Sequence, residues 1–461
     1  MSTSRHKASF RDPSGFLYSR DGLLYRQVNL SYQHQYRRMK DCGLYDDLTR
    51  EGLLVSHTEA DLGLAVTPAA YRVLQPDEIE FVSYPYEWCF SQLRDAALAT
   101  LRVQRRALDH GMILKDASAY NVQFRACRPL LIDTLSFDAY HDGSPWVAYH
   151  QFCEHFLGPL LLMSEVDVRL GRLLATHIEG IPLELASRLL PRRSWLRPSR
   201  LLHIHLHARS VRRHGDRPIR ASRFEGRMSR RAMDGLVDNL ETAVRGLDWK
   251  PVGTEWADYD TTHGYSADAL AEKKRLVGRM LASIEPGTVW DLGANVGTFS
   301  AVAASAGARV VAMDSDPAAT ERHYRRLRER GERSILPLQV DLRNPSPGLG
   351  WASSERDSLE DRGPADLVLA LAVVHHLAIG GNVPLPMIAD WLARLADRII
   401  VEFVPKDDPQ VRRLLSSRED IFSDYSGSGF ESAFERRFRI DEEEAIAGTG
   451  RTLYRMTARE R

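Results

Sequence analysis

Short apolar runs alternate with amphipathic segments from residue 253 to the end of the chain. Apolar runs of this length predict buried strands, and apolar positions three and four residues apart in the intervening segments predict helices. Such alternation predicts an α/β domain whose parallel sheet is covered by helices on both faces. We expect a first helix over 266–283, followed by seven strands at 288–292, 309–313, 335–340, 366–371, 398–403, 434–440 and 452–456.

The first 190 residues have a different pattern. Strand-like pieces are mixed there with helix-like ones, among them 88–110, where apolar residues recur at helical spacing. This mixture predicts an α+β domain. The segment that follows is rich in arginine and predicts a helical or linker region. We therefore expect three parts, at 1–190, 191–252 and 253–461.

The charges of the chain are balanced overall but not locally. Lysine and arginine together number 62, as do aspartate and glutamate, which argues against a uniformly basic nucleic-acid binder. Residues 191–231 nevertheless contain 13 arginines and only two acids, a local charge of +11. This strip predicts a charged surface between domains, with contacts to RNA phosphates or to an anionic substrate as the alternatives.

The chain shows no sign of a membrane or metal-binding protein. Its N-terminus lacks the apolar stretch of a secretory signal, and the longest apolar run, at 156–163, is too short to span a bilayer. The four cysteines form neither a disulfide framework nor a CxxC pair. His203, His205 and His207 alternate in the arginine-rich strip, but a solvated face is favoured over a metal site. We expect a cytoplasmic protein with no metal and no membrane span.

The sharpest motif is DLGANVG at 291–297, where an apolar strand ends and a helix begins. Gly293 and Gly297 would allow a ligand to approach the main chain closely. Asn295 replaces the middle glycine of a dinucleotide fingerprint. A dinucleotide site and a purely structural turn remain the alternatives to another nucleoside ligand.

Two further acids follow the next two strands. Asp314 lies 23 residues after Asp291, the position from which a carboxylate accepts hydrogen bonds from ribose hydroxyls. Asp341 offers an acceptor for an adenine amino group, and Leu342 an apolar cover for the ring. Because the carboxyl ends of parallel strands meet at one edge of a sheet, we expect the three acids to share a pocket.

Together these residues resemble the class I S-adenosylmethionine-dependent methyltransferases, over 288–461. The resemblance implies a Rossmann-like, seven-stranded methyltransferase sheet and S-adenosylmethionine as the cofactor. It implies that the cofactor is held by Asp291, Gly293, Asn295 and Gly297 at its methionine part, by Asp314, Asp341 and Leu342 at its adenosine part, and by Ala372 beside the reactive methyl group. Three further runs, HHLA at 375–378, NVPL at 382–385 and EFVPK at 402–406, are similar to methyltransferases of the rhizobial nodulation-protein type.

Three residues are candidates for catalysis. His375 and His376 follow the fourth strand, and an imidazole is suited to accept a proton near neutral pH, although packing or substrate-lining roles are the alternatives. Glu402 lies inside the apolar fifth strand, where a carboxylate is costly unless it is paired. It could orient a histidine or a substrate hydroxyl, or it could pair with Arg398 or Lys406.

The segment before the first helix, together with two lysines on that helix, carries aromatic and basic residues that would fold over the mouth of the cofactor site or anchor the linker. Aromatic faces attract a sulfonium cation and help to exclude water from the transfer. These residues are Trp256, Tyr259, His263, Tyr265, Lys273 and Lys274.

A second motif lies in the N-terminal region. Asp116, Asn121 and Asp133 have the spacing that kinases use for a catalytic base and two metal ligands, and the segment resembles the protein kinase and aminoglycoside phosphotransferase superfamily. The departures are clear, because no glycine-rich loop surrounds Gly22 and Arg26 is the nearest cation to the expected strand lysine. A degenerate kinase-like domain is favoured over an active one, and a helix-loop-hairpin whose acids cap turns is the alternative.

We therefore expect an enzyme that transfers a methyl group from S-adenosylmethionine to an unidentified acceptor atom, oxygen, nitrogen or carbon. The N-terminal domain would bind or present the substrate. A small-molecule acceptor is favoured, with RNA or protein as the alternatives. A nucleotide-binding or phosphotransferase-like regulator, and an RNA methyltransferase that uses the arginine-rich strip, are the competing hypotheses.

Overall fold

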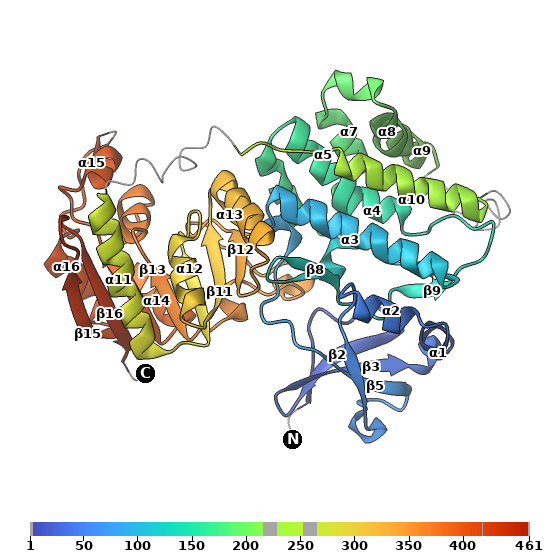
Figure 1. Ribbon diagram of the computed structural model, residues 1–461, viewed down its shortest axis with the longest axis horizontal. Coiled ribbons are helices and arrows are strands. Elements are labelled where there is room, and N and C mark those ends of the chain that lie inside the picture. Colours follow the sequence, from blue (N-terminus) through green and yellow to red (C-terminus); the bar gives the residue numbers. More distant parts are fainter. Residues whose placement is uncertain (1–2, 215–227, 252–264, 417, 460–461) are drawn as a thin grey trace. The chain divides into compact units, whose positions relative to one another are not determined.

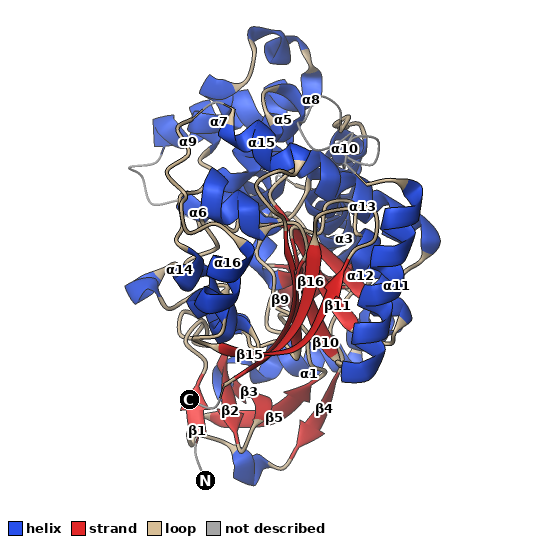
Figure 2. Ribbon diagram, turned by 90° about the vertical axis from the view of Figure 1, so that its left-hand side faces the viewer, coloured by secondary structure: helices blue, strands red, loops and turns tan. Residues whose placement is uncertain are grey.

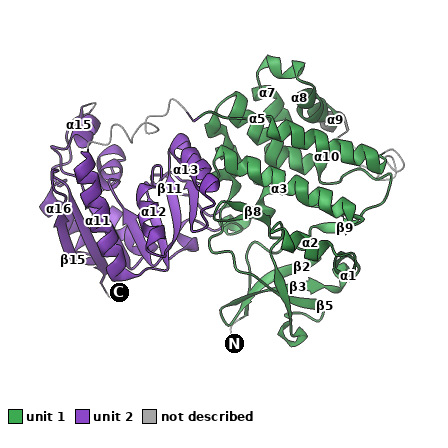
Figure 3. Ribbon diagram, viewed as in Figure 1, with its two compact units in different colours: residues 1–250, 349–356 green, residues 251–348, 357–461 purple. Residues whose placement is uncertain are grey.

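The computed structural model describes residues 3–214, 228–251, 265–416 and 418–459. The chain forms two compact units (Figure 3): residues 1–250 with 349–356, and residues 251–348 with 357–461. The described part of the arginine-rich region belongs to the first unit. No helix among the described residues is long and apolar enough to cross a membrane.

The second unit is built on a seven-stranded sheet (Figure 1). Its order is β12-β11-β10-β13-β14-β16-β15, in which the first five strands are parallel and β16 is antiparallel to both of its neighbours. All seven expected strands are present. Their bounds are Thr288–Leu292 (β10), Arg309–Asp314 (β11), Ile335–Gln339 (β12), Leu367–Ala370 (β13), Arg398–Phe403 (β14), Phe438–Ala445 (β15) and Thr452–Ala458 (β16).

One strand begins later than expected. The prediction placed it at 434–440, whereas β15 starts at Phe438 because a helix, Gly427–Phe434 (α16), occupies the preceding residues. Ser426 caps this helix through Gly429 N–H, and Phe430 and Phe434 are both fully buried. Their spacing of four residues suits one face of a helix, so Phe434 ends the helix instead of opening a strand.

Helices lie on both faces of this sheet (Figure 2), with α11, α12 and α13 on one side and α14 and α16 on the other. Side-chain caps start α11 and α13 as well as α16, since Ser266 accepts from Ala269 N–H and Asp316 accepts from the N–H groups of Ala318 and Ala319. The remaining bounds are Ala267–Ile284 (α11), Thr298–Ser305 (α12), Pro317–Arg330 (α13), Leu385–Leu395 (α14) and Pro409–Leu415 (α15), with a π-helix at His376–Gly380 (η13).

The first unit begins with a five-stranded antiparallel sheet in the order β1-β2-β3-β5-β4. Two short helices, α1 and α2, lie between β3 and β4 in the sequence. The bounds are Thr3–Arg5 (β1), Gly15–Arg20 (β2), Leu23–Asn29 (β3), Gln33–Asp41 (α1), Leu44–Arg50 (α2), His57–Ala60 (β4) and Ala70–Pro76 (β5).

A long helix, Phe90–Asp109 (α3), comes next, close to the expected range. Two ribbons follow it, in which β6 pairs with β9 and β7 pairs with β8. Their bounds are Met112–Leu114 (β6), Val122–Arg125 (β7), Arg128–Leu131 (β8) and Phe137–Ala139 (β9). The rest of the unit is helical: Tyr149–Phe152 (α4), Cys153–Leu157 (η5), Gly158–Glu165 (α5), Leu173–Thr176 (α6), Leu183–Leu189 (α7), Pro198–Arg200 (α8), Leu201–Leu206 (η8), His207–His214 (α9) and Arg230–Arg245 (α10).

The histidines of the arginine-rich strip lie on helices and have separate partners. His203 contacts Tyr149 Oη and Asn239 Oδ1, both at 2.7 Å, whereas His205 lies 2.8 Å from the hydroxyls of Ser187 and Ser194. His203 and His207 both contact the Tyr149 ring, whereas His205 is bonded to Ser187 and Ser194, so the three rings do not converge on one point. Among the described residues no group of three or more His, Cys, Asp or Glu side chains is arranged to hold a metal ion.

Candidate functional site

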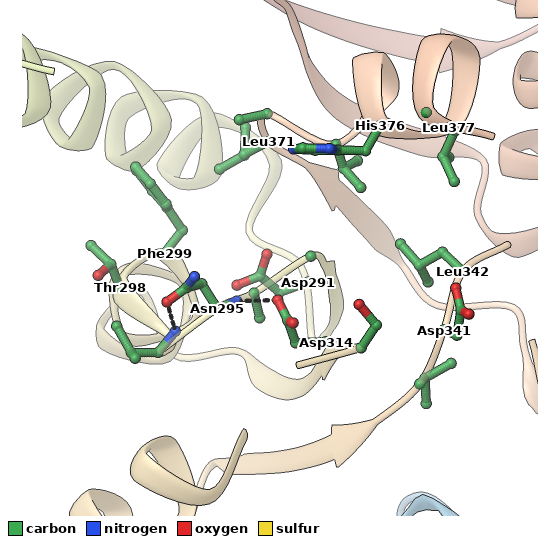
Figure 4. Close-up of a pocket in the computed structure, with 18 of the residues that line it drawn as sticks. Asp291, Asn295, Thr298, Phe299, Asp314, Asp341, Leu342, Leu371, His376 and Leu377 are labelled. Carbon is green, nitrogen blue, oxygen red and sulfur yellow. Dashed lines mark hydrogen bonds between the residues drawn. The ribbon is translucent and has the colours of Figure 1, made fainter. Parts of the chain in front are cut away.

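A pocket of about 410 Å³ opens at the carboxyl ends of β10, β11, β12 and β13 in the second unit (Figure 4). It unites most of the residues that the sequence singled out. Those that line it are Asp291, Gly293, Asn295, Asp314, Asp341, Leu342, Ala372 and His376. Gly297, His375 and Glu402 are not among the lining residues.

The turn after β10 wraps closely around its neighbours. Gly293 and Asn295 have φ angles of +75° and +50°, values that L side chains rarely adopt. Gly297 also has a positive φ, and a Cβ atom there would lie 2.0 Å from the His323 ring. Only glycine therefore fits at this position against α13. Gly297 is not among the lining residues, and its part in holding the cofactor stays a prediction.

Asp314 is held in place by the main chain. Its Oδ2 atom accepts from Asn295 N–H at 2.7 Å and its Oδ1 atom accepts from Asp316 N–H at 2.8 Å. Figure 4 shows the first of these bonds linking the glycine-rich turn to the end of β11. Burial raises the pKa of Asp314 to about 6 despite these bonds, so the carboxylate is ionised at pH 7 while its outer lone pairs face the pocket.

Asp291 lies deeper, at the floor of the pocket. Its side chain accepts from the Ser300 hydroxyl at 2.6 Å, and the residue is 2 % exposed. Burial raises its pKa to about 6, opposed by the Ser300 bond and by the positive charge of Lys273. Asp291 is thus a carboxylate that a cationic ligand group would stabilise.

A buried network of charges supports one wall of the pocket. Lys273 Nζ lies 2.6 Å from Glu402 Oε2, with side-chain exposures of 3 % and 0 %, and Tyr265 Oη donates to the same carboxylate. Arg451 lies 3.5 Å from Glu402 and forms two hydrogen bonds with Asp408, at 2.7 and 3.2 Å. Although burial opposes ionisation of Glu402, Lys273 and Arg451 hold its pKa below the ordinary value.

Glu402 is not among the lining residues, and its carboxylate is bound by Lys273, Tyr265 and Arg451. The two alternative partners that the sequence offered are engaged elsewhere, because Lys406 pairs with Asp420 at 2.8 Å and Arg398 donates to the Ile284 carbonyl. A catalytic role for Glu402 stays a prediction. Arg451 follows Glu402 by 49 residues, and no local pattern in the sequence connects them.

Only some of the aromatic and basic residues that the sequence placed at the mouth of the site line the pocket. Tyr265 and Lys273 line the pocket, whereas Lys274 does not. Phe299 also lines it, and its ring centre lies 4.5 Å from Lys273 Nζ. Trp256, Tyr259 and His263 lie outside the described residues. Arg343, Leu414 and Arg418 are lining residues that the sequence alone did not indicate.

The two histidines differ in their surroundings. His376 lines the pocket, and burial, followed by the charges of Arg343 and Arg451, lowers its pKa to about 4. His375 is 1 % exposed, has no hydrogen-bond partner at either ring nitrogen among the described residues, and has a pKa far below the ordinary value because of burial. His375 is therefore buried away from the residues that line the pocket, whereas His376 presents a neutral imidazole to it. Which of the two acts in catalysis stays a prediction.

The acids of the first unit are arranged differently. Asp133 forms an ion pair with Arg26 on β3, and Ser136 donates to its other oxygen. Asn121 reaches Ser136 Oγ at 3.4 Å, and Asp116 accepts from Ser118 N–H at 3.0 Å. Although burial opposes it, Arg26 holds the pKa of Asp133 below the ordinary value. Asp133 and Asn121 thus share a network through Ser136, while Asp116 caps its own loop.

The chain is similar to a curated protein over nearly its whole length. It is 38 % identical over 457 residues to the nodulation protein NoeA of Rhizobium meliloti (strain 1021), an alignment that covers 98 % of this chain and 95 % of that protein. No family model matches the chain.

The chain is similar to several solved structures, each of which covers less than half of it. Magnesium protoporphyrin IX methyltransferase (ChlM) from Synechocystis PCC 6803, with bound SAM, is 18 % identical, with coverage of 45 % of this chain and 86 % of that chain and a TM-score of 0.30. The N-methyltransferase NodS from Bradyrhizobium japonicum WM9 is 15 % identical, with coverage of 42 % and 99 % and a TM-score of 0.32. WbdD is 18 % identical, with coverage of 45 % and 43 % and a TM-score of 0.31.

Proposed function

The chain belongs to the family of the nodulation protein NoeA, and we propose that it is an S-adenosylmethionine-dependent methyltransferase whose cofactor binds in the pocket of the second unit. One observation carries this proposal. Asp291, Asp314 and Asp341, which belong to three successive parallel strands and the turns after them, line one pocket at the edge where such sheets bind nucleosides.

The adenosine part of the cofactor fits the donor and acceptor groups present. Asp314 is ionised at pH 7 and fixed by two backbone N–H groups, so its outer lone pairs can accept from the ribose hydroxyls. Asp341 accepts from Arg343 N–H through Oδ1, which leaves Oδ2 for the adenine amino group. Leu342 and Leu377 lie at the same end of the pocket and would cover the ring (Figure 4).

The methionine part fits the opposite end. Lys273 donates to Glu402 and to Tyr265 Oη, and its third N–H is suited to the carboxylate of the ligand. Asp291 would accept from the ligand ammonium group, which would relieve the cost of its burial. Glu402 and Arg451 hold Lys273 in the wall of the pocket, so they would affect cofactor binding indirectly, through the position of Lys273.

Methyl transfer in this pocket depends mainly on placement. When bound, S-adenosylmethionine supplies an electrophilic methyl group on a sulfonium centre. Ala372 and His376 follow β13, and we propose that they border the place where the acceptor meets that group. With a pKa of about 4, His376 is a weak base, so its neutral imidazole accepts a hydrogen bond from the acceptor and orients it, while alignment of the reactants supplies most of the acceleration.

For the first unit we propose a kinase-like domain that binds or presents the acceptor and does not transfer phosphate. A five-stranded antiparallel sheet, a long helix and two ribbons bearing Asp116, Asn121 and Asp133 support the kinase-like interpretation. The ion pair of Asp133 with Arg26 occupies the carboxylate that would otherwise bind a metal ion. A small molecule is the favoured acceptor, and RNA and protein are tested as alternatives.

Thermal unfolding of the full chain tests the proposal. S-adenosylhomocysteine is expected to raise the Tm of the second unit, because a ligand that binds only the folded state stabilises it by mass action. MgATP is expected to leave both units unchanged. Stabilisation by MgATP alone, abolished in Asp133→Asn, would instead support the nucleotide-binding regulator.

A further inference from the structure

The pocket carries two positive charges that the proposed cofactor does not use. The charged side chains that line it are Lys273, Asp291, Asp314, Asp341, Arg343 and Arg418. Under the proposed function, Asp314 and Asp341 bind adenosine, while Asp291 and Lys273 bind the ammonium and carboxylate groups of the methionine part. S-adenosylmethionine has a single anionic group and no phosphate, so Arg343 and Arg418 have no counterpart on it.

Both arginines lie beside the end of η13. Arg418 donates through Nη1 to the Ile379 carbonyl and, at 2.9 Å, to Asn382 Oδ1. Arg343 runs along Gly381, where a Cβ atom would lie 3.3 Å from its Cδ atom. Gly380 itself lines the pocket. The two guanidinium groups therefore flank one short stretch of the pocket wall, four residues beyond His376.

Neither arginine side chain is hydrogen-bonded to a carboxylate among the described residues. Arg343 forms a long ion pair in which its Nε atom lies 3.6 Å from Asp341 Oδ1, and its side chain is 58 % exposed. Arg418 has no ion pair in the described parts of the chain, and the nearby carboxylate of Asp420 is taken by Lys406 at 2.8 Å. This end of the pocket thus offers a positive field and guanidinium donors to an incoming molecule.

We infer that Arg343 and Arg418 form a subsite for an anionic group, a carboxylate or a phosphate ester, carried by the methyl acceptor. Guanidinium groups recognise both anions through paired N–H donors. An acceptor held there by its charge would have its reacting atom oriented next to His376 and Ala372, which is the kind of positioning that accelerates transfer. This inference rests on the proposed function, because it assigns the part of the pocket that the cofactor leaves open.

Anion binding to the full chain saturated with S-adenosylhomocysteine tests the inference. Calorimetric titrations with sodium phosphate and, separately, with sodium acetate at constant ionic strength would use the wild type, the double variant Arg343→Ala/Arg418→Ala, and Arg412→Ala. Arg412 is a matched control, since it is an exposed arginine on α15 that does not line the pocket.

At least one of the two anions is expected to bind the wild type and Arg412→Ala, with the affinity reduced at least about tenfold in the double variant. The anion that binds more tightly identifies the group that the subsite prefers. Affinity for S-adenosylhomocysteine is expected to stay within about twofold in all three proteins, because the arginines do not contact the cofactor.

Three results would overturn the inference: no binding of either anion to the wild type, equal binding to the double variant, or a large loss of cofactor affinity in the double variant. The last would assign the arginines to the cofactor. If the wild type does not bind S-adenosylhomocysteine, the proposed function fails, and the same titrations on the unliganded chain then decide the anion subsite independently.

Discussion

Asp314 in the second unit and Asp133 in the first are both carboxylates that follow a strand and face a candidate ligand site, yet their surroundings differ. Asp314 is held by two backbone N–H groups, which orient it without neutralising it, and its pKa is raised to about 6. Asp133 is held by the guanidinium of Arg26 and has a lowered pKa. Main-chain donors leave a carboxylate available to a ligand, whereas a cationic side chain satisfies it within the protein.

The largest expected effect contrasts the buried ion pairs of the two units. Glu402→Gln should destabilise the second unit by about 3–5 kcal/mol, because Lys273 and Arg451 would lose their shared counter-charge inside the protein. Asp133→Asn should lower the free energy of unfolding of the first unit by clearly less, since the side chains of Arg26 and Asp133 are 12 % and 19 % exposed. Chemical denaturation monitored separately for each unit measures both changes. Equal losses would contradict this ranking.

A smaller effect is expected at the methionine end of the pocket. Lys273→Met should weaken binding of S-adenosylhomocysteine about tenfold, because one donor to the ligand carboxylate is lost. Lys274→Met is the matched control, since this neighbour is exposed and does not line the pocket. Calorimetric titration gives both affinities, and similar losses in the two variants would remove Lys273 from the cofactor site.

The pH dependence of binding distinguishes the carboxylates of the two units. Asp291 and Asp314 have pKa values raised to about 6 and must be ionised to bind the cofactor. Affinity for S-adenosylhomocysteine should therefore fall as the pH decreases below about 6, by about tenfold per pH unit for each proton taken up. Titrations near pH 5, 6 and 7.5 measure this fall, and a flat profile would contradict the assignment.

The same shifts determine how the stability of the unliganded protein changes with pH. The folded second unit holds protons on Asp291 and Asp314 that the unfolded chain releases above about pH 4, so these two groups favour folding as the pH falls from about 6 to 4. The buried, neutral His323, His375 and His376 have lowered pKa values and oppose folding over the same range, because they are protonated only in the unfolded chain. Asp133 has a lowered pKa, so its contribution to the first unit is retained over this range and is lost only at lower pH. Unfolding at several pH values checks the opposite signs.

The smallest expected effect concerns the first unit. MgATP should not stabilise the Arg26→Gln variant strongly. Removal of the guanidinium frees the carboxylate of Asp133, but the carboxylate of Asp116 still accepts a hydrogen bond from its own loop. Nucleotide titration of this variant and of the wild type is the measurement. Tight binding of MgATP to the variant but not to the wild type would show that Arg26 blocks the nucleotide site.

Much of the second unit could be predicted from the sequence because its strands are short apolar runs and its acids lie at the carboxyl ends of those strands or just after them. Asp291, Asp314 and Asp341 needed only the rule that parallel strands end at the same edge of a sheet. The packing that requires glycine at position 297 could not be predicted, because it comes from the His323 ring, 26 residues later.

Long-range ion pairs could not be predicted from the sequence. Nearby Arg398 and Lys406 were the only partners that the sequence offered Glu402, but its charged partners come from α11 and from the turn before β16. Arg26 was recognised only as the nearest cation to an expected lysine, and its pairing with Asp133 depends on the sheet of the first unit. Such pairs follow from tertiary packing and leave no periodic signal in the sequence.

The central claim is that the pocket of the second unit binds S-adenosylmethionine, and a calorimetric titration of the full chain with S-adenosylhomocysteine tests it most directly. We expect one site per chain, an affinity about 10- to 100-fold weaker in Asp314→Ala, in keeping with the loss of charge-assisted hydrogen bonds to ribose, and an unchanged affinity in Asp133→Ala. No binding to the wild type, or an unaltered affinity in Asp314→Ala, would contradict the claim.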